Sequence, residues 1–112
     1  MKISGYVFGE IVIGGKRYTE DVVIFPERVM SWWRQKGHVV ETADLSEVAR
    51  AKPEVVILGT GAYGAVRVLP EVEKYFKSQN MRLIVLQTGE ACARYNELYE
   101  QNFVVAALHL TC

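Results

Sequence analysis

Hydrophobic and polar positions alternate through the first quarter of the chain. The segments ISGYVF (3–8) and EIVI (10–13) show this alternation, and KRYT (16–19) and DVVIFP (21–26) continue it. The pair Gly14–Gly15 stands between the second and third segments, where glycine supplies the positive φ angles of a two-residue hairpin turn. The pattern predicts antiparallel strands.

The second half of the chain contains uninterrupted apolar runs instead. EVVIL (54–58), LIVL (83–86) and VVAALHL (104–110) lack alternation, which is typical of parallel strands that are buried on both faces. Helical segments separate them: Pro70 suits the first turn of one helix, and Thr88 is expected to cap a second. The order strand, helix, strand, helix, strand predicts a βαβαβ unit with right-handed crossovers.

Two segments join these halves. Residues 27–40 fit either a helix or a strand followed by a turn at Lys36–Gly37, and we favour the strand. The pattern Asp44-x-x-Glu47 is a variant of the capping box, which predicts a short helix from Leu45 to about Ala51.

Length and composition are those of one α/β domain over residues 1–112. Half of the residues are hydrophobic, which is enough for a full core. Thirteen basic residues balance thirteen acidic ones, so the long-range positive field of a dedicated nucleic-acid binder is missing.

No segment has the composition of a membrane or targeting sequence. No apolar run approaches the ~20 residues that cross a bilayer. The first ten residues lack the apolar stretch of a signal peptide, and two cysteines are too few for a disulfide scaffold. We therefore expect a soluble, cytoplasmic protein without membrane insertion.

The first of the uninterrupted runs ends in GTGAYG (59–64), which matches G-x-G-x-x-G. A dinucleotide-binding loop needs its last glycine inside the first helical turn and an acidic residue roughly 20 positions later. Here five residues separate Gly64 from Pro70, and the next strand ends at Gln87–Thr88 without a carboxylate. We interpret the loop as a tight turn in which glycines relieve backbone strain, and we expect no nucleotide cofactor.

The same loop contributes to a candidate pocket. Carboxyl ends of parallel strands meet at one sheet edge, so residues 59–67, 88–92 and 109–112 are expected to lie together. A small anionic ligand is the kind of molecule that such an edge binds. The candidate pocket residues are Gly59, Thr60, Gly61, Tyr63, Gly64, Arg67, Thr88, Glu90 and His109.

Other reactive side chains do not form a recognisable site. His109 and Cys112 are three residues apart in an extended segment and therefore point to opposite faces, so we expect no metal site. Cys92 follows the start of the second helix, where the dipole lowers a thiol pKa, but its neighbours Ala91 and Ala93 indicate a core position. We assign no catalytic residue, and we favour a protein without enzymatic activity.

The segment WWRQKGH (32–38) sets two tryptophans among basic side chains. This composition can stack on nucleic acid, but seven residues on a neutral protein are a small platform. Tryptophan and arginine dominate the energetics of protein interfaces, so Trp32, Trp33 and Arg34 are candidate contacts with a protein partner, which includes a second copy of this chain. At least one of the tryptophans is expected to be buried.

Four segments together resemble one small family of α/β proteins. They are residues 6–38, EVVILGTGAYG (54–64), EACARYNEL (90–98) and the closing VVAALHLTC (104–112). The family includes mitochondrial complex I assembly factor 3 and the adipogenesis-associated domain-containing protein, with uncharacterised archaeal and bacterial members. The resemblance implies a three-layer fold in which N-terminal antiparallel strands pack beside a mixed central sheet.

The resemblance also bears on function. The family has no established enzymatic activity or cofactor and no agreed catalytic residues, and its eukaryotic assembly factor acts by binding other proteins. We therefore predict a non-enzymatic protein-interaction or assembly-factor-like module, and the alternative is a binding protein or enzyme that uses the pocket near Gly59–Gly64.

Overall fold

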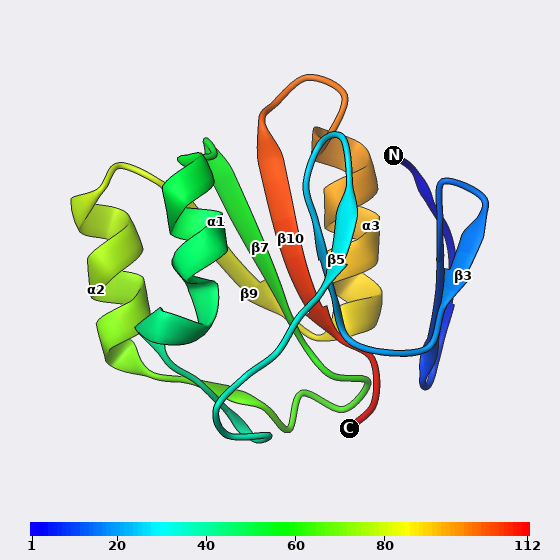
Figure 1. The fold of residues 1–112 in the computed structure, drawn as a ribbon, viewed down its shortest axis with the longest axis horizontal. Helices are drawn as coiled ribbons and strands as arrows, with labels where there is room; N and C mark the ends of the chain where they lie inside the picture. The colour runs from blue at the N-terminus through cyan, green and yellow to red at the C-terminus, as the bar shows by residue number, and fades with distance from the viewer.

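The computed structural model describes residues 1–112, and five strands form its central sheet. Figure 1 shows how the helices are arranged around this sheet. Their order across the sheet is β5-β4-β10-β7-β9. The three strands β10, β7 and β9 run parallel, whereas β4 is antiparallel to both β10 and β5. The bounds are β4 (Val22–Ile24), β5 (Val29–Ser31), β7 (Val55–Thr60), β9 (Arg82–Leu86) and β10 (Val104–His109).

The central strands β7 and β10 are buried along almost their whole length, as their uninterrupted apolar sequence predicts. Ile57 and Ala106 face one side of the sheet, and Val56 and Val105 face the other, each with no exposed surface. Two separate hydrophobic cores therefore lie on the two faces of one sheet.

Helices cover the face that carries Val56 and Val105. The 3-10 helix η1 (Thr42–Leu45), α1 (Ser46–Ala51) and α2 (Pro70–Ser78) form the layer on the left of Figure 1. Their inward side chains, among them Val48, Val72 and Phe76, share a core with Val56 and Val105. Pro70 occupies the first helical position, as predicted, where a missing N–H costs nothing.

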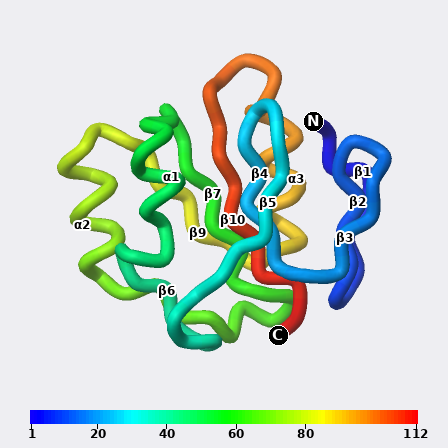
Figure 2. The backbone as a smooth tube through the Cα atoms, in the orientation of Figure 1, coloured from blue at the N-terminus to red at the C-terminus, as the bar shows by residue number.

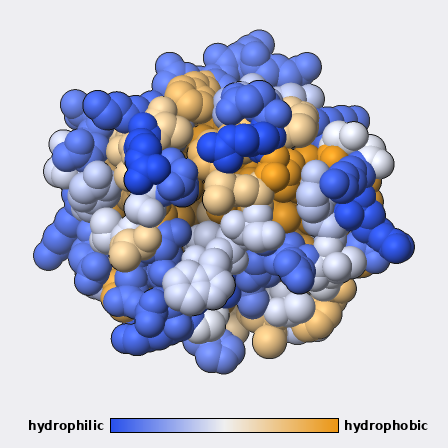
Figure 3. Space-filling view, in the orientation of Figure 1, coloured by the Kyte–Doolittle hydropathy of each residue, from blue (hydrophilic) through white to orange (hydrophobic).

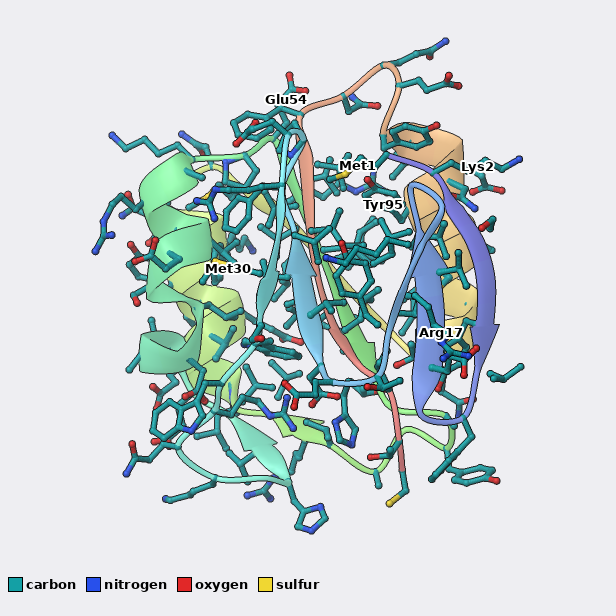
Figure 4. All side chains as sticks on the ribbon, turned by 45° about the vertical axis from the view of Figure 1, so that its right-hand side comes forward. Met1, Lys2, Arg17, Met30, Glu54 and Tyr95 are labelled. Atoms are coloured by element: carbon teal, nitrogen blue, oxygen red, sulfur yellow. The ribbon has the colours of Figure 1, made fainter.

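The second face carries helix α3 (Thr88–Leu98) and an antiparallel meander. The meander consists of β1 (Ile3–Val7), β2 (Glu10–Ile13) and β3 (Lys16–Tyr18). The Tyr95 hydroxyl donates to the Met1 carbonyl at 2.8 Å, and Figure 4 shows the two labelled residues next to each other near the start of the chain. The Asn96 side chain exchanges two hydrogen bonds with the backbone of Ile3. These bonds fasten the meander to the helix.

The connections follow the sequence pattern. Gly14 and Gly15 have φ angles of 57° and 82°, as the two-residue hairpin turn requires. In the ambiguous segment 27–40 the favoured strand is present as β5, and a short strand β6 (Val39–Val40) pairs in parallel with β8 (Arg67–Val68).

Two predicted caps are wrong. Asp44 is not an N-cap, because η1 already begins at Thr42, and the Asp44 carboxylate accepts the backbone N–H groups of Gln35 and Glu41. Thr88 is the first residue of α3, and Gln87 is the N-cap of this helix. The Thr88 hydroxyl does not cap the helix and donates to the His109 carbonyl at the end of β10.

The surface is mixed. On the side drawn in Figure 3, apolar atoms gather where β5 approaches the meander, and a cavity of about 270 Å³ there is lined by residues that include Tyr18, Val29 and Met30. None of the helices combines the length and the apolar content needed to cross a bilayer.

The two cysteines are expected to differ sharply in reactivity. Cys92 is buried beneath the meander, and burial raises the pKa of its thiol to about 12, whereas Cys112 is exposed. Iodoacetamide at mildly alkaline pH should therefore alkylate Cys112 in the native protein and Cys92 only after unfolding, as followed by mass spectrometry. Rapid labelling of the native Cys112→Ser variant would contradict this assignment.

Candidate functional site

The candidate site lies at one end of the central sheet, which we call the rim. Strands β5, β7, β9 and β10 end there and β4 begins there, as their directions require. The C-terminus and the chain that follows β7 lie at this lower end of the molecule in Figure 2. The β1–β2 turn reaches it as well, because the Gly9 N–H donates to the Leu110 carbonyl at 2.8 Å.

A buried ion pair organises the rim. Asp21, which precedes β4, accepts a hydrogen bond from Arg34 Nη1 through Oδ2 at 2.9 Å, and its Oδ1 accepts the Leu110 N–H at 2.9 Å. His109 Nδ1 lies 2.7 Å from the same Oδ2. Since a carboxylate only accepts, His109 carries a proton on Nδ1, and the 3.2 Å approach of Arg34 Nη2 to that nitrogen is a contact without a shared proton.

This cluster is shielded from water. The Arg34, His109 and Asp21 side chains are 5%, 12% and 19% exposed. Arg34 stacks on Trp32, 4.6 Å from the ring, and also donates to the Gly37 carbonyl. One carboxylate therefore joins the chain after β5 to the chain at the end of β10.

The charge state of Asp21 follows from these contacts. Burial raises the pKa of its carboxyl, but hydrogen bonds from His109, the Leu110 N–H and Arg34 outweigh that effect. The pKa of Asp21 consequently lies below its ordinary value of 3.8.

The glycine loop packs against the end of the chain. Gly61 has a φ of 107°, which only glycine adopts readily, and a Cβ there would collide with the Cys112 carbonyl. Ala62 and Ala65 donate their N–H groups to the carbonyls of Thr111 and Cys112, and the Gly61 N–H donates to Thr88 Oγ1. The loop is thus a tight turn, as predicted, and the N–H groups of Gly61, Ala62 and Ala65 have partners inside the protein.

The structure brings some of the predicted pocket residues together. Thr88 contacts Gly59, donates to the His109 carbonyl at 2.6 Å and accepts from Gly61. Thr60 is buried beside them and donates to the Leu86 carbonyl.

The remaining pocket candidates lie outside this cluster. Tyr63, Gly64 and Glu90 are exposed, and Arg67 sits in the small β6–β8 sheet with its side chain in solvent. The largest cavity, about 510 Å³, lies elsewhere, between α2 and β9. Ligand binding by these residues stays a prediction.

The candidate protein-contact residues divide into two kinds. Trp32 is buried and its Nε1 donates to the Asp44 carbonyl at 3.1 Å, and the Arg34 side chain is engaged with Asp21. Trp33 between them is 73% exposed. The expectation that at least one tryptophan is buried is confirmed, and Trp33 is the member of the trio that a partner can reach.

Exposed aromatic residues stand on three different segments of the rim. Phe8 on the β1–β2 turn and Tyr63 on the glycine loop contact each other with ring centroids 6.1 Å apart, and both are exposed. Trp33 follows β5 at the same end of the sheet. Phe103, which precedes β10, lies at the opposite end.

Asp21 was missed by reasoning from sequence. It closes the polar run Thr19–Asp21 before a strand, where a charged residue ordinarily faces solvent. Its role depends on β4 lying antiparallel beside β10, which places Asp21 next to His109 and Leu110. No local pattern carries that information.

Comparison with known proteins places the chain among α/β proteins of unknown function. The sequence model of a family described as "Protein of unknown function (DUF498/DUF598)" matches residues 3–109. The NADH dehydrogenase [ubiquinone] 1 alpha subcomplex assembly factor 3 of Xenopus tropicalis is 24% identical over 109 residues, which are 96% of this chain. The chain spans 59% of the length of that relative.

Solved structures of similar proteins confirm the fold. The conserved hypothetical protein PH1505 from Pyrococcus horikoshii OT3 superposes with a TM-score of 0.91 at 29% identity, and both chains are covered completely. A protein designated MT938 has a TM-score of 0.84 at 30% identity, with 99% of this chain and 98% of that one covered. The predicted α/β class and the mixed central sheet are therefore confirmed.

Alanine substitutions at two glycines of the rim should have opposite effects. A Cβ at Gly59 would lie 2.8 Å from both Leu108 Cδ2 and Thr88 Oγ1, so we expect Gly59→Ala to lower the free energy of unfolding by about 1–3 kcal/mol. Gly89 in α3 has open space, so Gly89→Ala should raise it by about 0.5–1 kcal/mol. Urea denaturation measures both, and equal effects of the two substitutions would contradict the packing described.

Stability should depend on pH through Asp21. Because its pKa is lower in the folded protein than in the unfolded chain, its contribution is present above the unfolded pKa and is lost as pH falls through the folded pKa. Asp21→Asn should cost about 2–4 kcal/mol at neutral pH, since Arg34 is left buried without its counter-ion, and the difference from wild type should shrink in acid.

Denaturant titrations across this pH range test the assignment. Glu20→Gln removes an exposed carboxylate next to Asp21 and serves as the matched control, which should match wild type throughout. A stability deficit of Asp21→Asn that stays constant down to the most acid pH would overturn the assignment.

Proposed function

We propose that this chain, which belongs to the DUF498/DUF598 family, is a non-enzymatic protein-interaction module of the assembly-factor kind, whose contact surface is the rim. The surface is formed by Phe8, Tyr63 and Trp33, three exposed aromatic side chains on three different rim segments. Their exposure is the observation that supports the proposal most directly, because aromatic residues are enriched at protein interfaces and costly to leave in water.

The segments that carry these aromatic residues are held by hydrogen bonds to the rest of the protein. Trp33 stands between Trp32 and Arg34, both of which are anchored in the protein. The loop of Tyr63 is fixed by the bonds of Ala62 and Ala65 to the last two residues, and the turn of Phe8 by the bond of Gly9 to Leu110. A surface that is ordered before binding loses little conformational entropy when a partner docks, which favours affinity.

The comparison with known proteins supports the same class of function. The Xenopus tropicalis relative is named an assembly factor, and its similarity reaches across 96% of this chain. The present chain spans only part of the length of that relative. The name of the relative therefore does not identify the partner of this chain.

The alternative, a small anionic ligand at the glycine loop, has weaker support. An anion site of this kind uses free backbone N–H groups, whereas those of Gly61, Ala62 and Ala65 already have partners. Arg67 is the exposed cation of the loop region, and ligand binding there remains a prediction.

We further infer a cytoplasmic location, which the two free thiols Cys92 and Cys112 favour.

Substitution of rim aromatic residues tests the proposal. Trp33→Ala and Tyr63→Ala should each weaken partner binding by about 2 kcal/mol, or roughly 30-fold, if the rim is the contact surface. Phe103→Ala is the matched control, because it removes an exposed aromatic side chain at the opposite end of the sheet.

The measurement has two stages. Quantitative affinity purification with the intact chain identifies proteins that wild type and Phe103→Ala retain and the rim variants lose, and calorimetric titration of the purified partner then gives the affinities. Circular dichroism confirms that each variant is folded. Identical retention by folded rim variants and control would refute a contact surface at the rim.

A further inference from the structure

Strand β9 forms one edge of the central sheet. Its only neighbour in the sheet is β7, so the outward-facing N–H and C=O groups of β9 have no strand beside them. Residues 83–86 are Leu, Ile, Val and Leu, and all four remain partly exposed, whereas the facing residues of β7 are buried. An uncharged apolar edge of this length is a template for another strand.

The two edges of the sheet are not equivalent. Strand β5 on the opposite edge has three residues, and short edge strands pair poorly with another chain. Strand β9 has five residues, and Arg82 at its start is its only charged residue. Other sheets in proteins protect such an edge with central charges, proline or a covering segment.

Helix α2 lies beside this edge and leaves a hollow. The cavity of about 510 Å³ between α2 and β9 is lined by Glu73, Lys77 and residues 80–83. Glu73 and Lys77 are exposed and stand four residues apart, so they lie on one side of the helix, next to the strand. Neither joins an ion pair within the chain.

We propose that a second copy of this chain occupies the β9 edge, by antiparallel pairing of β9 with the same strand of the partner about a two-fold axis near Ile84. Leu83 then lies opposite the partner's Val85, and the central sheet continues from one copy into the other. Because the axis is perpendicular to the sheet, each face continues as well, and the two α2 helices lie antiparallel on the same face.

Charge on α2 identifies a second copy as the occupant. Two antiparallel α2 helices place Glu73 opposite the partner's Lys77 and Lys77 opposite the partner's Glu73, so both contacts are attractive. A residue spacing of one turn with opposite charges is self-complementary only in this antiparallel arrangement. The apolar run of β9 is self-complementary too, since every position from 83 to 85 meets another aliphatic residue.

The rim stays free in this dimer. Antiparallel pairing points the carboxyl ends of the two β9 strands in opposite directions, so the two rims lie at opposite ends of the shared sheet. The dimer thus presents two separate copies of the proposed contact surface, and its formation does not depend on the rim aromatic residues.

Charge exchange on α2 provides a sharp test, with sedimentation velocity across a concentration series as the measurement. Wild type should reach twice the 12.7 kDa chain mass. Glu73→Lys and Lys77→Glu each turn two attractive contacts into two repulsive ones, and each should weaken dimerisation by about tenfold or more. Both residues are exposed, so folding should be unaffected.

The two single variants complement each other. An equimolar mixture of Glu73→Lys with Lys77→Glu restores both attractive contacts and should recover the dimer as a heterodimer, and the double variant should recover it as a homodimer. Lys74→Glu makes the same charge change on an exposed α2 residue away from the hollow, and it should dimerise as wild type does.

Amide hydrogen exchange tests the strand pairing itself. Amides within residues 82–86 should be more protected at high protein concentration than after dilution in wild type, and the gain should be lost in Glu73→Lys. A monomeric wild type at every concentration would overturn the proposal, and so would single variants that dimerise like wild type. A dimer without added protection of residues 82–86 would equally refute pairing through β9.

Discussion

The burial of β10 on both faces and both edges is the constraint on which the rest of the structure depends. Its backbone pairs with β7 in parallel and with β4 in antiparallel fashion, and its side chains from Val104 to Leu108 are almost inaccessible to water. Each face of the strand needs an apolar cover, because apolar side chains that stay in contact with water contribute little hydrophobic stabilisation. The α1–α2 layer and the α3–meander layer supply these two covers.

Where β10 ends, polar bonding takes over from hydrophobic burial. Leu110 is buried beyond the last paired residue of β10, and buried backbone groups need hydrogen-bond partners within the protein. Asp21 accepts the Leu110 N–H, Tyr6 and Gly9 donate to the Leu110 carbonyl, and the glycine loop donates to the last two carbonyls. Residues 110–112 thereby connect the segments of the rim, and the three exposed aromatic residues stand on segments that bond to these residues or to Asp21.

The success of the sequence-based predictions depended on the range of the interactions involved. Uninterrupted apolar runs identified β7, β9 and β10, and Gly14–Gly15 identified a hairpin, because each signal resides in neighbouring residues. The caps at Asp44 and Thr88 were wrong for the converse reason. The Asp44 carboxylate caps the preceding turn through the Glu41 N–H and also accepts the Gln35 N–H, and the Thr88 hydroxyl is held by the distant His109 carbonyl.

The sequence by itself determined the α/β class, the parallel strands of the second half and the presence of one buried tryptophan, because burial and periodicity are properties of short segments. Only the tertiary structure decided that Trp32 is the buried one, that Asp21 joins Arg34 to His109, and that the glycine loop and the Trp-Trp-Arg segment share one rim. Those facts follow from β4 inserting antiparallel beside β10. Such pairing joins residues 88 positions apart, and no local pattern encodes a contact that depends on the order of strands in a sheet.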